Sequence, residues 1–321
     1  MEFCCNPNNL YLSGSSEIKN DYIAHARLIL DIISRHATKT QLRKIKADLQ
    51  LVGVHFDEAK YLQAACESSV AASIALAYPG TFKYEPKLNP PSDVDCSFSS
   101  GDYTFNIEVK CPNYKKYHEH ASKDCYSIGA MGRLDDYPTS FYQIKSLRGW
   151  DKPVEQQVHM DNKLKDYLIS CQKKFSGEAL ENELNLLLVC CDSAMEMQKW
   201  MHYMYGEKGL LSESSYIEPN LYSKVDAVIL TNLYHKHYSY WEKDKLHDHW
   251  SAGKSFNLIF KNISVKRGKD DAIIHLLDVF PNFSRELSSY ELSGLEEVTR
   301  IPRFVNSLIE KQEVYYFQPR I

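Results

Sequence analysis

Long apolar runs and a secretion signal are both missing from this chain of 321 residues. No apolar stretch approaches the roughly 20 residues that a membrane-spanning helix needs. The first residues, Met-Glu-Phe-Cys-Cys, lack the basic region and the apolar stretch of a signal peptide. We therefore expect a cytoplasmic protein that has no membrane partner.

The cysteines lack the pattern of a disulfide framework or of a zinc ribbon. Their number, nine, is odd, two pairs are adjacent in the sequence, and no two have the C-x-x-C spacing. Such a set suits a reducing cytoplasm. Four of them lie in apolar runs and are expected to be small core residues: Cys66, Cys96, Cys190 and Cys191.

An excess of basic charge is also missing, because 38 basic residues stand against 42 acidic ones, a net charge of −4. A protein that coats duplex DNA through phosphate contacts is usually basic. Any nucleic acid contact here must therefore use local basic patches. The chain also has no Walker loop, no G-x-S-x-G elbow and no Rossmann glycine pattern, so these classes of site find no support.

The spacing of apolar residues predicts a helical first third followed by a mixed sheet. No stretch is rich enough in Pro, Gly or Ser to divide the chain, so we expect one α/β (α+β) body with a mixed central β-sheet flanked by helices. Residues 1–56 would form a helical N-terminal extension, residues 57–280 the core, and residues 281–321 a C-terminal extension packed on that core. Helices are expected at about residues 16–36, 40–49, 57–78, 151–175 and 304–310, and strands at about residues 81–85, 93–98, 103–110, 184–191, 225–231, 256–260 and 273–280.

Residues 93–110 predict a β-hairpin with one apolar and one polar face, joined by a four-residue turn at residues 99–102. Side chains alternate across a strand, so Asp95, Glu108 and Lys110 lie on the polar face, and folding brings Asp95 beside Glu108. A plain solvent-facing surface is the alternative. Like charges opposite each other disfavour that alternative unless a cation lies between them. The apolar face carries Val94, Cys96, Phe98, Phe105, Ile107 and Val109.

These residue types suit a divalent cation. Mg²⁺ prefers oxygen ligands, usually one or two carboxylates, and leaves places for water and phosphate. Asp95 and Glu108 would hold Mg²⁺, or Mn²⁺ in its place, with the backbone carbonyl of Val109 as a neutral ligand. The cation would lower the pKa of a bound water and stabilise charge on a phosphate. Lys110 would orient the attacking water or stabilise the developing charge.

This arrangement resembles the PD-(D/E)xK nuclease superfamily, which has the restriction-endonuclease-like fold. The resemblance rests on Asp95 and on Glu108-Val109-Lys110 followed by Cys111-Pro112, with a separation of 108 − 95 = 13 residues that suits the family. No Pro-Asp pair occurs, and residues 91–93 read Pro-Ser-Asp, so Asp93 competes with Asp95 for the role of the aspartate. Asp95 is preferred because apolar residues follow it at alternate positions.

The resemblance also implies a glutamate on the helix before the hairpin, and Glu67 is the match. Glu67 shares a helical face with Val70 and Ile74, so it is expected to point inward. An unpaired buried carboxylate is costly, and a metal would remove that cost. A glutamate paired with a lysine on the helix flank is the alternative. The resemblance covers about residues 57–191, where a helix after Lys110 precedes an apolar strand.

Two further groups could contact nucleic acid. A basic loop directly after the motif would grip phosphates, unless it is a plain solvated loop; its residues are Lys115, Lys116, His118 and Lys123. Residues 234–250 are rich in His, Lys, Tyr and Trp. They are interpreted as a solvated segment, as an aromatic surface that stacks on bases, or as a transition-metal site. A second basic patch consists of Lys261, Lys266, Arg267 and Lys269.

The sequence therefore predicts a Mg²⁺-dependent phosphodiesterase, an endonuclease that cuts DNA by metal-activated water attack, with restriction or defence as a fitting role. An RNA-cleaving nuclease or toxin stays open. So does a catalytically inactive nucleic-acid-binding or scaffold protein, although the intact Asp95, Glu108 and Lys110 count against it. A homodimer is left open.

Overall fold

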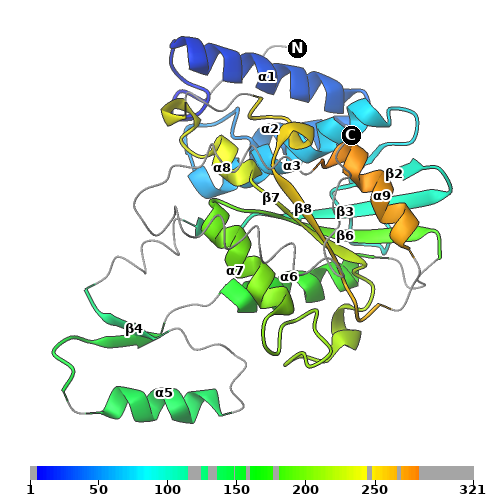
Figure 1. Ribbon diagram of the computed structural model, residues 1–321. Coiled ribbons are helices and arrows are strands. Elements are labelled where there is room, and N and C mark those ends of the chain that lie inside the picture. The colour runs from blue at the N-terminus through cyan, green and yellow to red at the C-terminus, as the bar shows by residue number, and fades with distance from the viewer. Residues whose placement is uncertain are drawn as a thin grey trace.

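The computed structural model describes residues 6–114, 124–128, 136–147, 149–156, 160–175, 181–243, 248–265 and 269–281. Within them, helices flank a six-stranded mixed sheet (Figure 1), which confirms the expected fold class. The elements are α1 (Glu17–Ser34), α2 (Lys39–Asp48), α3 (Glu58–Ala77), β1 (Lys83–Tyr84), β2 (Cys96–Ser100), β3 (Tyr103–Lys110), β4 (Tyr126–Ile128), α5 (Tyr137–Ser146), β5 (Val154–Gln156), α6 (Met160–Lys174), β6 (Glu183–Cys190), α7 (Ala194–Tyr205), β7 (Ala227–Thr231), α8 (Leu233–His237), β8 (Asn257–Lys261) and α9 (Asp270–Val279), with short 3₁₀ helices at Pro219–Tyr222, Tyr240–Glu242 and Ala252–Lys254.

The six strands lie in the order β1-β2-β3-β6-β7-β8. β1, β2 and β3 form an antiparallel meander, β6 and β7 continue parallel to β3, and β8 closes the sheet antiparallel to β7. Every residue of β6 and of β7 is buried. Strands covered on both faces are continuously apolar, as the run at residues 184–191 predicted.

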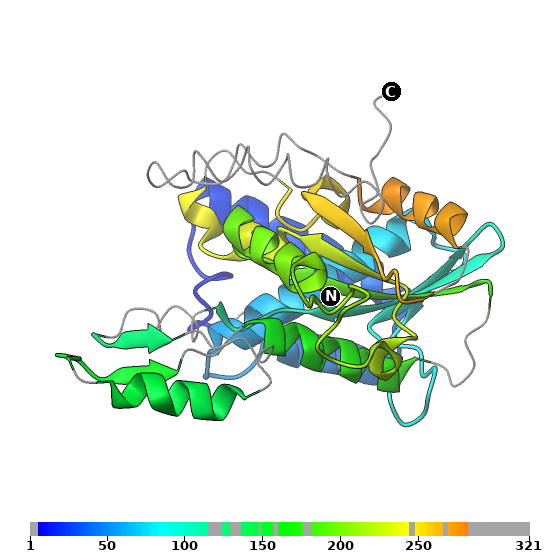
Figure 2. The ribbon, with the colours of Figure 1, turned by 60° about the horizontal axis from the view of Figure 1, so that its bottom comes forward.

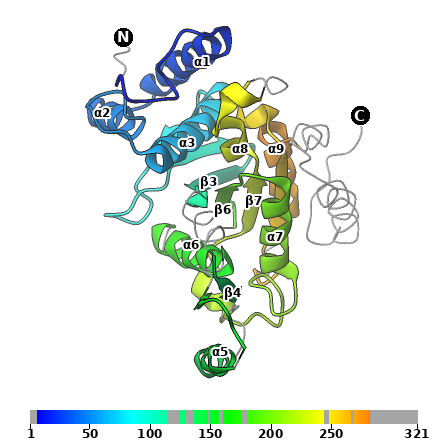
Figure 3. The same cartoon turned by 90° about the vertical axis from the view of Figure 1, so that its left-hand side faces the viewer.

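Helices cover both faces of the sheet (Figure 3). α3, α8 and α9 lie on one face, with α1 and α2 packed on the outside of α3, and α6 and α7 lie on the other. The buried apolar residues form one continuous core that runs from Tyr11 to Phe280. The described part of the first 56 residues therefore packs directly on the sheet-bearing body.

β4, α5 and β5 form a small unit beside this body, between β3 and α6 in the chain (Figures 1 and 2). β4 and β5 are parallel and pair only with each other among the described residues. Val154 is the one buried residue among the side chains described in this unit. The predicted helix at residues 151–175 is thus wrong in its first third: Val154–Gln156 pair with Tyr126–Ile128, and the helix starts at Met160.

The predicted strand at residues 273–280 is also wrong, because Asp270–Val279 form helix α9. Two aspartates occupy its first turn, where the helix dipole favours negative charge. Ile273, Leu276 and Leu277 are buried while Ile274 is 57% exposed. This spacing of three and four residues is helical, and His275 interrupts any alternation that a strand would need.

The three predicted N-terminal helices are confirmed as α1, α2 and α3. Ser16 caps α1 by accepting a hydrogen bond from the Lys19 amide, and Asp57 caps α3 by accepting one from the Lys60 amide. The hairpin also forms, although its turn is shorter than expected, because the strands reach Ser100 and Tyr103 and leave Gly101 with a φ of +57° between them. The expected helix at residues 304–310, and residues 282–321 of the C-terminal extension, lie outside the described residues.

Candidate active site

The register of the hairpin places Asp95 opposite Glu108. Cys96 pairs with Ile107, and one step further along both chains is the pair Asp95 and Glu108. The Asp95 carboxylate accepts a hydrogen bond from the Val109 amide, at 2.6 Å between Oδ2 and N. Val109 itself is 1% exposed. The backbone of β3 thus anchors the aspartate beside the strand that carries Glu108 and Lys110.

Glu108 is the most enclosed of the predicted site residues that the structure describes, with its side chain 1% exposed. Its Oε1 atom accepts hydrogen bonds from two ammonium groups, Lys110 Nζ at 2.5 Å and Lys174 Nζ at 2.6 Å. Its Oε2 atom is buried and has no hydrogen-bond partner among the described residues. One half of this carboxylate is therefore neutralised, and the other half is a bare acceptor.

Glu67 approaches the same group from α3. Gln63 donates a hydrogen bond to its Oε1 atom at 2.8 Å. The pKa of the Glu67 carboxyl is raised to about 7, because burial and the charge of Glu108 together outweigh the lowering effects of Gln63 and Lys110. The helix thus brings a third carboxylate within electrostatic range of Glu108 and Lys110.

The charges of these groups act strongly on one another. Burial raises the pKa of Asp95 well above its ordinary value, and the carboxylates of Glu108 and Glu67 raise it further, against Lys110 and the Val109 amide. Burial alone lowers the pKa of Lys110, but Glu108 and Asp95 outweigh it, and the pKa lies above its ordinary value. Crowded carboxylates with raised pKa values mark a place where additional positive charge is stabilised.

Asp93, the competing aspartate, faces a different neighbour. It acts on the pKa of Lys44, which pairs with Glu85 at 2.5 Å. It is not among the charges that perturb Asp95, Glu67 or Lys110 most strongly. The geometry therefore favours Asp95 for the role that the sequence left between the two.

The donor set fits a hard divalent cation in chemistry. Asp95, Glu108 and Glu67 supply carboxylate oxygens, the ligands that Mg²⁺ and Mn²⁺ prefer, and the buried Oε2 of Glu108 has no other partner among the described residues. Across the part of the chain that the structure describes, however, no three His, Cys, Asp or Glu side chains already converge into a ligand set. Lys110 and Lys174 both form ion pairs with Glu108, so the positive charge beside this carboxylate comes from ammonium groups.

Two residues beside this site were missed from the sequence. Lys174 ends α6, three residues after the buried Cys171 and next to the buried Phe175, so its position on the inward helical face was the available signal. Tyr84 lies on β1. Its pKa is raised by burial and by the charges of Glu85, Glu67 and Asp95, so it shares the electrostatic environment of these carboxylates, and nothing in its local sequence indicated this.

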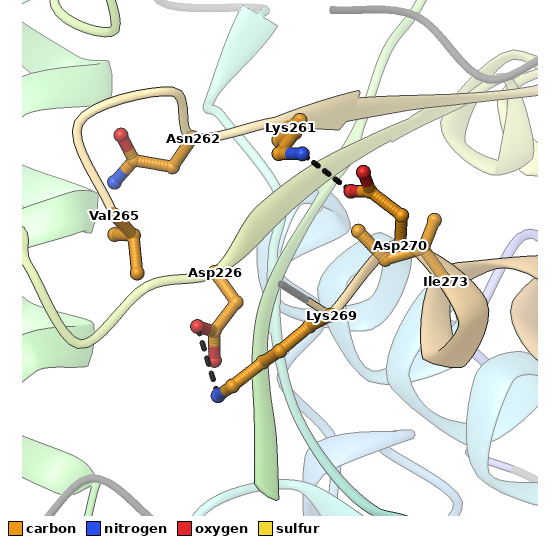
Figure 4. A pocket seen from close by; sticks show the side chains of 7 residues that line it. All are labelled: Asp226, Lys261, Asn262, Val265, Lys269, Asp270 and Ile273. Carbon is orange, nitrogen blue, oxygen red and sulfur yellow. Dashed lines mark hydrogen bonds and ion pairs between the residues drawn. The ribbon is translucent and has the colours of Figure 1, made fainter. Parts of the chain in front are cut away.

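The predicted phosphate-gripping loop lies outside the described residues, and with it Lys115, Lys116, His118 and Lys123. The second basic patch does not form a basic surface where it is described (Figure 4). Lys269 is 4% exposed and pairs with Asp226 at 3.1 Å, and Lys261 pairs with Asp270. These pairs line a small pocket at the amino-terminal end of β7, while the predicted site lies near the carboxyl-terminal end of the parallel β3.

The interpretations of the histidine-rich segment as a solvated or base-stacking surface are wrong for the three histidines described there, His235, His237 and His249, because all three are buried. His237 is 0% exposed and contacts Tyr22 OH at 2.7 Å and Ser69 Oγ at 3.0 Å through its two ring nitrogens. Burial lowers its pKa well below the ordinary value. His249 Nδ1 donates to the Lys236 carbonyl at 2.7 Å. Within the described residues the segment joins the N-terminal helices to the core, and it forms no metal-ligand group.

Comparisons with models of protein families, with curated proteins and with solved structures found no match. Among the described helices, none is long and apolar enough to cross a membrane. A functional conclusion must therefore come from the geometry and the charges around Glu108.

Proposed function

We propose that this chain is a metal-dependent nuclease of the PD-(D/E)xK type, which hydrolyses phosphodiester bonds of DNA. One observation carries the proposal. The buried Glu108 carboxylate accepts hydrogen bonds from two lysines at one oxygen, while its other oxygen has no hydrogen-bond partner among the described residues. Asp95 and Glu67 lie close enough for their charges to interact with that of Glu108. Supporting it, α3 precedes the hairpin and α6 leads into β6, parallel to β3, the order that the resemblance implies.

Each residue has a defined task in this proposal. Asp95 and Glu108 would hold Mg²⁺ or Mn²⁺, with the Val109 carbonyl as a further ligand. The bound cation supplies an acidic water and stabilises charge on the phosphate. Lys110, held on Glu108 at 2.5 Å, orients the attacking water or stabilises the negative charge that develops on the phosphate oxygens. Glu67, whose pKa of about 7 lies near neutrality, can accept a proton at its carboxylate.

The test is cleavage by the full-length protein and by Glu108→Gln. Circular DNA, linear DNA and RNA are each incubated with Mg²⁺, Mn²⁺, Ca²⁺ or EDTA. We expect the wild type to cut DNA with Mg²⁺ or Mn²⁺ and to bind it without cutting in Ca²⁺, because Ca²⁺ tolerates irregular coordination and positions water less tightly. Glu108→Gln keeps the size of the side chain and should lose at least about a hundredfold in rate, the scale of one electrostatic group in a transition state.

Matched measurements separate the outcomes. Circular dichroism of Glu108→Gln should match the wild type, so that a lost activity reflects chemistry. Cleavage that persists in excess EDTA, or in Glu108→Gln, contradicts the proposed mechanism. Cleavage of RNA alone would keep the mechanism and change the substrate. Binding without cleavage in any metal would favour the inactive nucleic-acid-binding protein.

A further inference from the structure

Lys174 adds a second positive charge to the candidate site from an element that the motif does not include. It is the last residue of α6, the helix that follows the β4–α5–β5 unit in the chain. Its Nζ atom lies 2.6 Å from Glu108 Oε1. Its side chain is 25% exposed, whereas the side chain of Glu108 is 1% exposed. The ammonium is thus anchored on a buried carboxylate and still reached by solvent.

The two lysines compete for one oxygen, and this limits what Glu108 can offer. Lys110 Nζ and Lys174 Nζ both donate to Oε1, while Oε2 has no hydrogen-bond partner among the described residues. Lys110 follows Glu108 by two residues on the same strand face, so its position is set by β3. Lys174 comes from a separate helix, so its backbone is not tied to the strand that carries Glu108, and its flexible side chain can leave Glu108 without a change in the sheet.

The formal charges show what Lys174 changes. Asp95, Glu67 and Glu108 with Lys110 and Lys174 sum to −3 + 2 = −1 when all are ionised. A divalent cation brings the sum to +1, and a phosphodiester group brings it to 0. Without Lys174 the same three states are −2, 0 and −1. The lysine therefore opposes binding of the cation and favours binding of the phosphate.

We propose that Lys174 is a positioning residue that balances the divalent cation against the phosphate: it occupies Glu108 in the metal-free protein and attracts the scissile phosphate once a cation is held. The inference rests on the proposed function. It adds to that site a positively charged side chain, the Lys174 ammonium, that comes from outside the hairpin and responds to the phosphate of the substrate. It makes a prediction with two opposite signs. Removing the charge of Lys174 should strengthen binding of a divalent cation and weaken binding of DNA.

The experiment uses full-length wild type, Lys174→Met and Lys174→Gln. The glutamine removes the charge and keeps a hydrogen-bond donor, on a side chain that is one atom shorter, and the methionine removes the charge and the donor. Lys173→Met is the matched control. Lys173 lies in the same helical turn and is exposed, and its replacement removes the same charge from the protein. Calorimetric titration with Mn²⁺ alone measures cation affinity, and filter binding of a labelled DNA duplex in Ca²⁺ measures phosphate affinity. Neither readout requires cleavage.

Both Lys174 variants should bind Mn²⁺ on the order of tenfold more tightly and the duplex on the order of tenfold more weakly, as loss of one close charge implies. Lys173→Met should leave the Mn²⁺ affinity unchanged. Affinities that are unchanged, or that both fall, in the Lys174 variants overturn the inference while wild-type cleavage keeps the proposed function. Loss of folding in both variants would assign Lys174 to stability and also overturn it. A wild type that neither binds Mn²⁺ nor cleaves DNA overturns the proposed function itself.

Discussion

Replacing Glu67 by glutamine tests the charge crowding around Glu108 without any assay of activity. Glutamine keeps the shape of the side chain and an acceptor for Gln63, which donates to Glu67 at 2.8 Å. Burial and the charge of Glu108 raise the pKa of Glu67 to about 7 in the folded protein, from an ordinary value of 4.5. Between pH 4.5 and pH 7 the folded state therefore holds a proton that the unfolded state releases. The contribution of this proton to stability is full below pH 4.5 and is lost as the pH rises through 7.

The magnitude follows from the difference between the two pKa values. That difference is 7 − 4.5 = 2.5, and at 1.36 kcal/mol per pKa unit it corresponds to about 3.4 kcal/mol of unfolding free energy. Glu67 is partly exposed, so solvent screening reduces this to about half. We expect the stability of Glu67→Gln relative to the wild type to rise by about 2 kcal/mol between pH 4.5 and pH 8.

The assay is urea denaturation of both proteins in EDTA at several pH values. The quantity compared is the unfolding free energy of the variant minus that of the wild type at each pH. The difference is needed because burial lowers the pKa of His235 to about 3 and lowers that of His237 as well. These neutral histidines make both proteins lose stability as the pH falls below about 6.5, and they cancel in the difference. Glu213→Gln, at an exposed glutamate, is the control and should give a flat difference. A flat difference for Glu67→Gln as well would refute the crowded site.

Two further predictions concern the assignment of the aspartate and the role of the histidine-rich segment. Asp95→Asn should abolish Mg²⁺-dependent cleavage while Asp93→Asn retains most of it, because Asp95 shares the charge cluster of the site; the reverse result in the same cleavage assay would exchange the two roles. His237→Phe should lower the unfolding free energy by about 2 to 3 kcal/mol, because it removes two buried hydrogen bonds, those of the ring to Tyr22 and to Ser69. Cleavage per folded molecule should stay unchanged, and a denaturation midpoint equal to that of the wild type would contradict the structural role.

The sequence was informative wherever local rules decide the structure. The caps at Ser16 and Asp57 and the alternation around Glu108 follow from neighbours within a few residues, and α1, α3 and β3 formed at their predicted places. The face shared by Glu108 and Lys110 is equally local, because it depends only on strand geometry.

Features that depend on distant partners were not predictable in this way. Val154 is extended because it pairs with Tyr126, 28 residues away. His237 is buried because Tyr22 and Ser69 satisfy its ring nitrogens, and polar composition alone predicted exposure. The local pattern places Lys174 on the inward face of α6, but it cannot name Glu108 as the partner, because that contact depends on how α6 packs on the sheet.

The contact between Tyr22 and His237 also has a consequence for synthesis of the chain. These residues lie 215 positions apart, and Tyr240 donates to the Tyr11 carbonyl across 229 positions. At about 5 to 20 residues per second, the ribosome needs roughly 10 to 40 s to produce the second partner after the first. Throughout that interval the nascent N-terminal helices expose aromatic surface that later becomes core. A chaperone that binds early nascent chains should therefore engage this protein at residues 11–30 and release it only after residue 240 has emerged.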